Sequence, residues 1–220
     1  MCKTIYLILE GDDDIRFFDK IISPLIIDHG CTIVYSKQSM RKKKNCGKFL
    51  QAIENMNEWD YLYAKDIDVF PCAKSRKEHI MEELSGKIDV NKILIVAKVI
   101  ESWYLAGVGD RTMRSLGVTP ENIRKINRST DHIDKAKFYE FFPSSKAQSE
   151  IMIALLNDYD IETAKQRNKS FNYFVSKFLY RLLRIPIYLM FVGFSREHLL
   201  FFALNASFFL IFISFSVIFR

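Results

Sequence analysis

The stretch from Lys3 to Asp14, KTIYLILEGDDD, contains the change of pattern that decides the fold class. Its first seven residues form an apolar, β-branched run, which is typical of a buried strand. The run stops at Glu10-Gly11, and apolar residues then recur at helical spacing from Ile15 to Leu25. Asp12 to Asp14 place negative charge at the start of this helix, where the helix dipole favours it. The chain is therefore predicted to begin with a strand followed by a helix.

The same alternation continues over about the first hundred residues. Further apolar runs predict strands at Cys31 to Tyr35, at Tyr61 to Ala64 and at Ile93 to Ala97. Helical patterns separate these runs, one starting near Phe49 and one after Pro71. Four strands that alternate with helices predict an α/β fold, with a small parallel sheet flanked by helices.

The rest of the soluble sequence is predicted to be helical. Thr119-Pro120-Glu121 is a good helix start, and further helices fit Ser145 to Asn157 and Ser170 to Leu183. We therefore expect an α/β core over residues 1–107 and a helical extension packed on it over residues 108–183. Residues 184–220 form an apolar tail.

Composition restricts the class of protein but does not identify it. The 220 residues include 32 Lys plus Arg and 26 Asp plus Glu, for a net charge of +6, and 49% are hydrophobic. These values exclude disorder, collagen and coiled coil as the main state. The four cysteines lie far apart, and the first residues lack the basic and then apolar pattern of a secretory signal. We therefore expect a reduced, cytoplasmic protein.

Acidic side chains follow three of the predicted strands. Glu10 ends the first strand, Asp66 and Asp68 end the third, and Glu101 lies just past the fourth. Ligands of parallel sheets bind outside the carboxyl ends of the strands, so these acids should face one another. If Asp66-Ile67-Asp68 is extended, both aspartates point to the same side.

Carboxylates gathered so closely repel one another unless they are protonated or bridged by a cation. Oxygen ligands suit Mg²⁺ or Mn²⁺, and the scattered histidines do not indicate zinc. The alternative is structural, because acids at strand ends also cap helices and solvate loops. Glu101 fits a helix start, and Asp12 to Asp14 fit one too, with a metal contact from one of the three as an open alternative.

Basic residues accompany the acids along the chain. One group lies between the second strand and its helix, and a second follows the Asp-x-Asp pattern. Together they supply the candidate nucleic-acid-binding residues: Arg41, Lys42, Lys43, Lys44, Lys74, Arg76 and Lys77. Cations beside a metal would bind a phosphate backbone, whereas the alternative is a solvated, charged loop.

Three segments, LEG at Leu9 to Gly11, DID at Asp66 to Asp68 and ESWYLA from Glu101, resemble the TOPRIM domain. In that domain a glutamate after the first strand and a later Asp-x-Asp motif bind Mg²⁺. Within that superfamily the ESWYLA segment and NKSFNYF from Asn168 look like the families related to OLD nucleases and RloB, including domain of unknown function family 4276. The resemblance implies a TOPRIM-like (Rossmann-like) sheet, with Glu10, Asp66 and Asp68 as catalytic residues and Glu101 as a further metal ligand.

The activity that this resemblance implies is Mg²⁺-dependent cutting of phosphodiester bonds in DNA or RNA, often in defence against phage or mobile DNA. OLD nucleases also carry an ATPase, whereas this chain has no Gly-x-x-x-x-Gly-Lys-Ser/Thr loop, so any ATPase or regulator is expected to be a separate partner. The competing hypothesis is a non-catalytic, metal-stabilised module that binds nucleic acid or protein.

The apolar tail has three open interpretations. Residues 199–219 contain no charged side chain, and at about 1.5 Å per residue they suffice to cross a bilayer core of about 30 Å. The arginines that precede this run would keep the body of the protein on the cytoplasmic side of the membrane. The other two interpretations are a terminus translated from a shifted reading frame and a helix used in homodimer formation.

Overall fold

The computed structural model describes residues 3–38 and 43–183, and the predicted tail lies outside these residues. Contacts within the chain group Met1–Leu183 into one compact unit. Within the described residues, no helix is both long enough and apolar enough to cross a membrane. The run proposed for that role, residues 199–219, is outside the described part.

Four parallel strands form one sheet in the order β2-β1-β3-β4. The strands are β1 (Thr4–Leu9), β2 (Thr32–Lys37), β3 (Trp59–Asp66) and β4 (Ile93–Val96). The chain moves outward from β1 to β2 and then returns to the other side of β1 to form β3. The strand order therefore reverses between β1 and β3, and ligands of open parallel sheets bind at such a point. The predicted parallel α/β sheet flanked by helices is confirmed.

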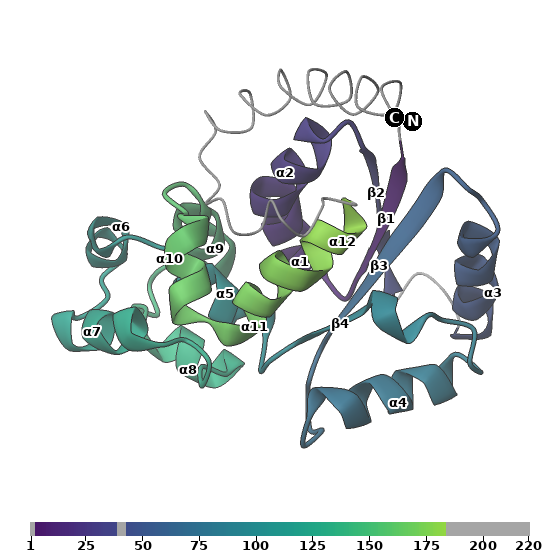
Figure 1. Ribbon diagram of the computed structural model, residues 1–220. Helices are drawn as coiled ribbons and strands as arrows, with labels where there is room; N and C mark the ends of the chain where they lie inside the picture. Colours follow the sequence, from purple (N-terminus) through teal and green to yellow (C-terminus); the bar gives the residue numbers. More distant parts are fainter. Residues whose placement is uncertain (1–2, 39–42, 184–220) are drawn as a thin grey trace, which may run out of the picture. The chain divides into compact units, whose positions relative to one another are not determined.

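Side-chain alternation along the strands divides the core between the two faces of the sheet. On one face, Leu7 of β1 and Leu94 of β4 join a large cluster with the helices of the first crossover and of the C-terminal part. On the other face, Ile8 and Ile93 join a smaller cluster with α3 (Lys43–Glu54) and α4 (Ala73–Glu83). Helices cover both faces (Figure 1), which explains why β4 is apolar at every position.

The first crossover is one nearly continuous helical stretch, made of α1 (Asp12–Phe17), a π-helical turn (Phe18–Ile22) and α2 (Ser23–Asp28). A 3-10 turn (Val90–Lys92) follows α4 and leads into β4, and after β4 the described chain consists of helices joined by loops. These helices are α5 (Ile100–Ala106), α6 (Asp110–Ser115), α7 (Pro120–Arg128), α8 (Lys135–Glu140), α9 (Gln148–Leu156), α10 (Ile161–Arg167), α11 (Lys169–Tyr173), a π-helical turn (Phe174–Leu179) and α12 (Tyr180–Leu182). The predicted start at Thr119 is confirmed, since its hydroxyl accepts a hydrogen bond from the backbone N–H of Asn122.

Aromatic rings join the C-terminal helices to the first crossover and to α5. Phe17 and Phe18 from the first crossover pack against Trp103 of α5, and Trp103 stacks on Phe174 at a centroid distance of 5.4 Å. Phe171 of α11 completes the group. All five side chains are fully buried, so the helices after residue 107 share one core with the α/β part.

Candidate metal and phosphate site

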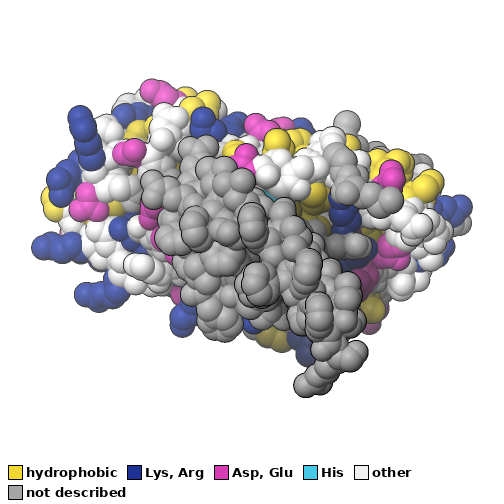
Figure 2. Space-filling model, turned by 45° about the horizontal axis from the view of Figure 1, so that its top comes forward, with side chains coloured by type: hydrophobic (Ala, Val, Ile, Leu, Met, Phe, Trp, Pro, Cys, Tyr) yellow, Lys and Arg dark blue, Asp and Glu magenta, His cyan; other side chains and the backbone are white. Residues whose placement is uncertain are grey.

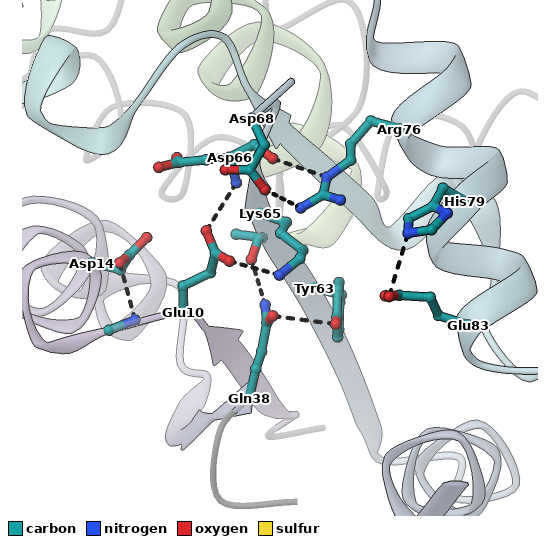
Figure 3. Close-up of polar contacts among 12 residues, drawn as sticks. Glu10, Asp14, Gln38, Tyr63, Lys65, Asp66, Asp68, Arg76, His79 and Glu83 are labelled. Carbon is teal, nitrogen blue, oxygen red and sulfur yellow. Dashed lines mark hydrogen bonds and ion pairs between the residues drawn. The ribbon is translucent and has the colours of Figure 1, made fainter. Parts of the chain in front are cut away.

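Glu10 lies directly after β1 and bridges to β3. Its Oε1 is 2.7 Å from Lys65 Nζ, and its Oε2 accepts a hydrogen bond of 3.2 Å from the backbone N–H of Asp66. The register explains this contact, because β1 and β3 pair in parallel up to Ile8 and Tyr63. Glu10 is thus fixed at the carboxyl end of the sheet where the strand order reverses, as predicted (Figure 3).

Asp66, the last residue of β3, is the centre of the acidic group. Its Oδ1 is buried and has no hydrogen-bond partner among the described residues. The pKa of Asp66 is raised to about 9, first by burial and then by the charges of four neighbouring acids, Asp14, Glu10, Glu101 and Asp68. The four acids that were predicted to meet therefore act on one another electrostatically, and a fifth acid joins them.

The fifth acid is Asp14, in the first turn of α1. Asp12 and Asp13 pair with Lys37 and Arg16, as charges at a helix start do, whereas Asp14 is 7% exposed. Burial raises the pKa of Asp14 to about 6, and Glu10 and Glu101 contribute to the rise, although the backbone N–H of Gly11 opposes it through a 3.1 Å hydrogen bond. The sequence left open that one of the three aspartates reaches the site, and Asp14 is the one that turns toward it.

Glu101 lies in the first turn of α5, so its predicted place at a helix start is confirmed. It is also only 3% exposed, and its Oε1 lies 3.3 Å from Nζ of Lys135, the first residue of α8. A buried carboxylate costs free energy unless a cation pairs with it. Here that cation comes from the helical extension, which sequence patterns did not foresee.

Asp68 is arranged differently from the expectation for an extended Asp-Ile-Asp segment. Its φ of 51° is left-handed, so the chain turns after Ile67 and the strict alternation of side chains ends. The carboxylate pairs with Arg76 of α4 and is half exposed, and the same arginine donates to the carbonyl of Asp66 at 3.1 Å. Asp68 thus lies at the edge of the acidic group, beside Asp66, and does not line its centre (Figure 3).

The residues predicted to bind phosphate do not form one group within the described part of the structure. Arg41 and Lys42 lie outside the described residues, and α3 already begins at Lys43, so the chain at Lys43 and Lys44 is helical and not a loop. Lys74 is exposed, Arg76 is buried and pairs with the half-exposed Asp68, and Lys77 donates to the carbonyl of Val90. Of the three α4 residues, Lys74 is the most exposed, and its ammonium group lies 3.9 Å from Glu78 on the same helix.

Another set of basic side chains is exposed on α6 and α7. Figure 2 shows Lys and Arg side chains projecting from the end of the molecule that carries these helices. They are Arg111, Arg114, Arg124, Lys125 and Arg128. Some of them also pair with acids on their own helix, as Lys125 does with Glu121.

A buried polar network holds α5 against the C-terminal helices. The Asn168 side chain, which is fully buried, donates to Ser102 Oγ at 3.3 Å and to Thr130 Oγ1 at 3.0 Å. Its oxygen accepts from Ser170 Oγ at 2.8 Å, and Ser170 in turn accepts from the indole N–H of Trp103. The network fixes the helix that carries Glu101, and it explains why Asn168 and Ser170 occur in this segment.

In this arrangement, no three Asp, Glu, His or Cys side chains within residues 3–38 and 43–183 form a ready group for a metal ion. Lys65, Arg76 and Lys135 each pair with one of the acids. The residues nevertheless fit a hard divalent cation, because the donors are all carboxylate oxygens and the buried Oδ1 of Asp66 has no partner among the described groups.

Comparison with known proteins gave two solved structures, while no family model and no curated protein matches the chain. Both structures are of the C-terminal region of the Xanthomonas campestris pv. campestris OLD protein. The one phased with iodine has a TM-score of 0.40 and 13% identity, covering 76% of this chain and 93% of that one. The one phased with platinum has a TM-score of 0.39 and 11% identity, covering 82% and 97%. OLD proteins are among those that the sequence motifs resemble, but these values are too low to transfer activity or residue roles.

Proposed function

We propose that this protein is a Mg²⁺-dependent nuclease that hydrolyses phosphodiester bonds of DNA or RNA. The observation that carries the proposal is Asp66, whose buried Oδ1 has no hydrogen-bond partner among the described residues and whose pKa is raised to about 9. A carboxyl group surrounded by other acids is stabilised by a proton or by a divalent cation. Of these two, we assign the divalent cation at neutral pH, because a bound cation would let the acidic group take part in catalysis.

Glu10, Asp66 and Glu101 would hold the ion, with Asp14 beside them and Asp68 at the edge. A bound Mg²⁺ stabilises charge on a phosphate oxygen and makes a coordinated water more acidic. The protein's contribution is to position these acids. Glu10 is hydrogen-bonded to β3 and Asp14 to the start of α1, and the network around Asn168 holds α5, the helix that carries Glu101. A role in defence against phage or mobile DNA stays a prediction of the motif resemblance.

One observation favours a second candidate, a non-catalytic module that binds nucleic acid or protein. Three of the five acids already pair with a cation of this chain, namely Glu10 with Lys65, Asp68 with Arg76 and Glu101 with Lys135. Internal cations of this kind can replace a metal as the partner of buried carboxylates. In such a module, nucleic-acid binding would survive the loss of the acids.

The test is cleavage of supercoiled plasmid and of total RNA by the full-length protein with Mg²⁺, with Mn²⁺ or with EDTA. We expect metal-dependent cutting that is lost in Glu10→Gln and in Asp66→Asn, both of which keep the shape of the side chain. The matched control is Glu121→Gln, an exposed acid on α7 that pairs only with its neighbour Lys125 among the contacts described. Removing a metal ligand should reduce the rate by at least about a hundredfold, as loss of a group that stabilises the transition state does.

Metal binding is measured on the same proteins as the rise in melting temperature that Mg²⁺ causes. We expect this rise in the wild type and in Glu121→Gln, and not in Asp66→Asn. A wild type that binds nucleic acid but neither responds to Mg²⁺ nor cuts either substrate would exclude the nuclease and favour the binding module.

A further inference from the structure

Helix α8 presents two polar side chains toward the acidic group. Lys135 and Tyr139 are four residues apart, so they lie on the same face of the helix. Lys135 is 3.3 Å from Glu101, as described above. Burial raises the pKa of Tyr139, and the next contributor is the charge of Glu101, which puts the phenol in the electrostatic environment of the same carboxylate.

The hydroxyl of Tyr139 is a polar group without a hydrogen-bond partner in the described part of the protein. Its oxygen is buried, and no described residue forms a hydrogen bond with it. The ring itself is well placed, packing edge to face on Phe138 at 5.1 Å. A buried hydroxyl without a partner costs free energy. We therefore expect a bound ligand to supply the hydrogen-bond acceptor for Tyr139.

Lys135 has the features of a side chain that can change partners. Its side chain is 63% exposed, whereas that of its partner Glu101 is 3% exposed. A lysine is a point charge on a flexible stem, so it can leave one anion for another nearby without rearrangement of the helix. A divalent cation on Glu101 would take over the neutralisation of this carboxylate and free the ammonium group.

We propose that Lys135 and Tyr139 of α8 bind a non-bridging phosphate oxygen of the nucleic-acid substrate, Lys135 by its charge and Tyr139 by a hydrogen bond from its hydroxyl. This inference rests on the proposed function and deepens it, since it assigns substrate positioning to the helical extension. Two donors on one helix face, beside a group of acids that needs a cation, match an anion bound next to a metal. Tyr139 and Lys135 are positioning residues in this scheme, and the carboxylates remain the metal ligands.

The test measures binding of a fluorescein-labelled single-stranded oligonucleotide, as DNA and as RNA, to the full-length protein by fluorescence anisotropy with Ca²⁺ in place of Mg²⁺. Tyr139→Phe removes the hydroxyl alone and keeps the ring on Phe138. We expect it to weaken binding about tenfold, the ratio that one hydrogen bond to a charged group provides. Lys135→Met should weaken binding by a similar factor and reduce the slope of log affinity against log salt by about 0.7 to 0.9.

The matched control is Lys137→Met, which removes a lysine from the same helix but from a different face. We expect it to bind the oligonucleotide within about twofold of the wild type. A second readout is the Mg²⁺-dependent rise in melting temperature, which Tyr139→Phe should leave unchanged because the phenol is not a ligand. Lys135→Met should respond to Mg²⁺ at equal or lower concentration, since the ammonium group competes with the ion for Glu101.

Unchanged oligonucleotide affinity in Tyr139→Phe would overturn the inference, and so would an equal loss in Lys137→Met. A wild type that binds no oligonucleotide would overturn it together with the proposed function. A wild type that binds but does not cut would remove the nuclease proposal alone, because the comparison of variants by binding would still decide the role of α8.

Discussion

The raised pKa of Asp66 has a consequence for stability that can be measured directly. In the unfolded chain an aspartate titrates near its ordinary pKa of 3.8, whereas burial and the neighbouring acids raise the pKa of Asp66 in the native state to about 9. Between these two values the native state holds a proton that the unfolded chain has lost. The contribution of Asp66 to the free energy of unfolding of the metal-free protein therefore falls as pH rises, by up to about 1.4 kcal/mol per pH unit.

We predict that Asp66→Asn removes this contribution and leaves the smaller one of Asp14, whose pKa is raised to about 6. In EDTA at about pH 8 the variant should be more stable than the wild type, because the amide has no charge to bury, and the difference should shrink toward about pH 5. Urea unfolding at several pH values measures it. A variant that is less stable than the wild type at the higher pH would contradict the electrostatic interpretation.

Asp60, at the other end of β3, provides a control of opposite sign. Burial alone would raise its pKa, but hydrogen bonds and charges from Lys3 and Lys92 hold the pKa of Asp60 below its usual range. Its contribution to stability is therefore present at neutral pH and is lost as pH falls through the native pKa. Asp60→Asn should destabilise the protein at about pH 8, where Asp66→Asn stabilises it.

At the scale of elements, the strands and their order of alternation could be predicted from the sequence, because apolar, β-branched runs are local. The observed β1 and β4 lie within about a residue of the predicted runs, while β2 extends two residues further, to Lys37. The start of α3 was placed too late, at Phe49, because the preceding turn is basic and shows no apolar spacing. Lysines are nevertheless good helix formers, and the helix begins at Lys43.

The candidate site was predictable only where topology alone places a residue. Glu10 and Asp66 follow strands of one parallel sheet, so their meeting follows from the fold. The left-handed backbone at Asp68 cannot be predicted from the sequence Asp-Ile-Asp. The inward orientation of Asp14 cannot be predicted either, because its position is that of any acid in the first turn of a helix. Lys135 and Tyr139 reach the site through packing of α8 on α5, a contact between segments far apart in the chain.

The network around Asn168 gives a prediction for the helices that hold Glu101. Asn168→Ala should lower the free energy of unfolding by about 2 to 3 kcal/mol, because it removes the hydrogen bonds that this fully buried side chain makes with Ser102, Thr130 and Ser170. The matched control is Asn172→Ala on the same stretch, whose side chain contacts Ser176 on an exposed face and whose loss should cost less than about 0.5 kcal/mol. Urea unfolding of both variants measures the contrast, and equal losses would show that the network contributes nothing beyond an exposed contact.

At the scale of the whole molecule, the large core cluster contains residues from both sides of residue 107, the predicted boundary between the α/β core and the helical extension. It joins Leu7 and Leu94 of the sheet to residues of the last helices, such as Phe171 and Leu182. Hydrogen bonds cross the same boundary, since Tyr159 donates to the carbonyl of Trp103 at 2.8 Å and the N–H of Asp160 donates to that of Gly107 at 2.9 Å. The acidic group and the helices that cover it therefore belong to one compact unit.

This unity predicts that residues 1–107 do not fold alone, although they contain all four strands and every acid of the proposed site. In this fragment Phe17, Phe18 and Trp103 would lose the rings of Phe171 and Phe174. Exposing a large apolar side chain costs about 2 kcal/mol, so three such losses are comparable with a typical domain stability of about 5 to 15 kcal/mol. Near-ultraviolet circular dichroism during heating should show a cooperative transition for residues 1–183 and none for residues 1–107. A cooperative transition in the shorter fragment would instead make the α/β part an independent domain, and Mg²⁺ binding would then have to be sought there without α8.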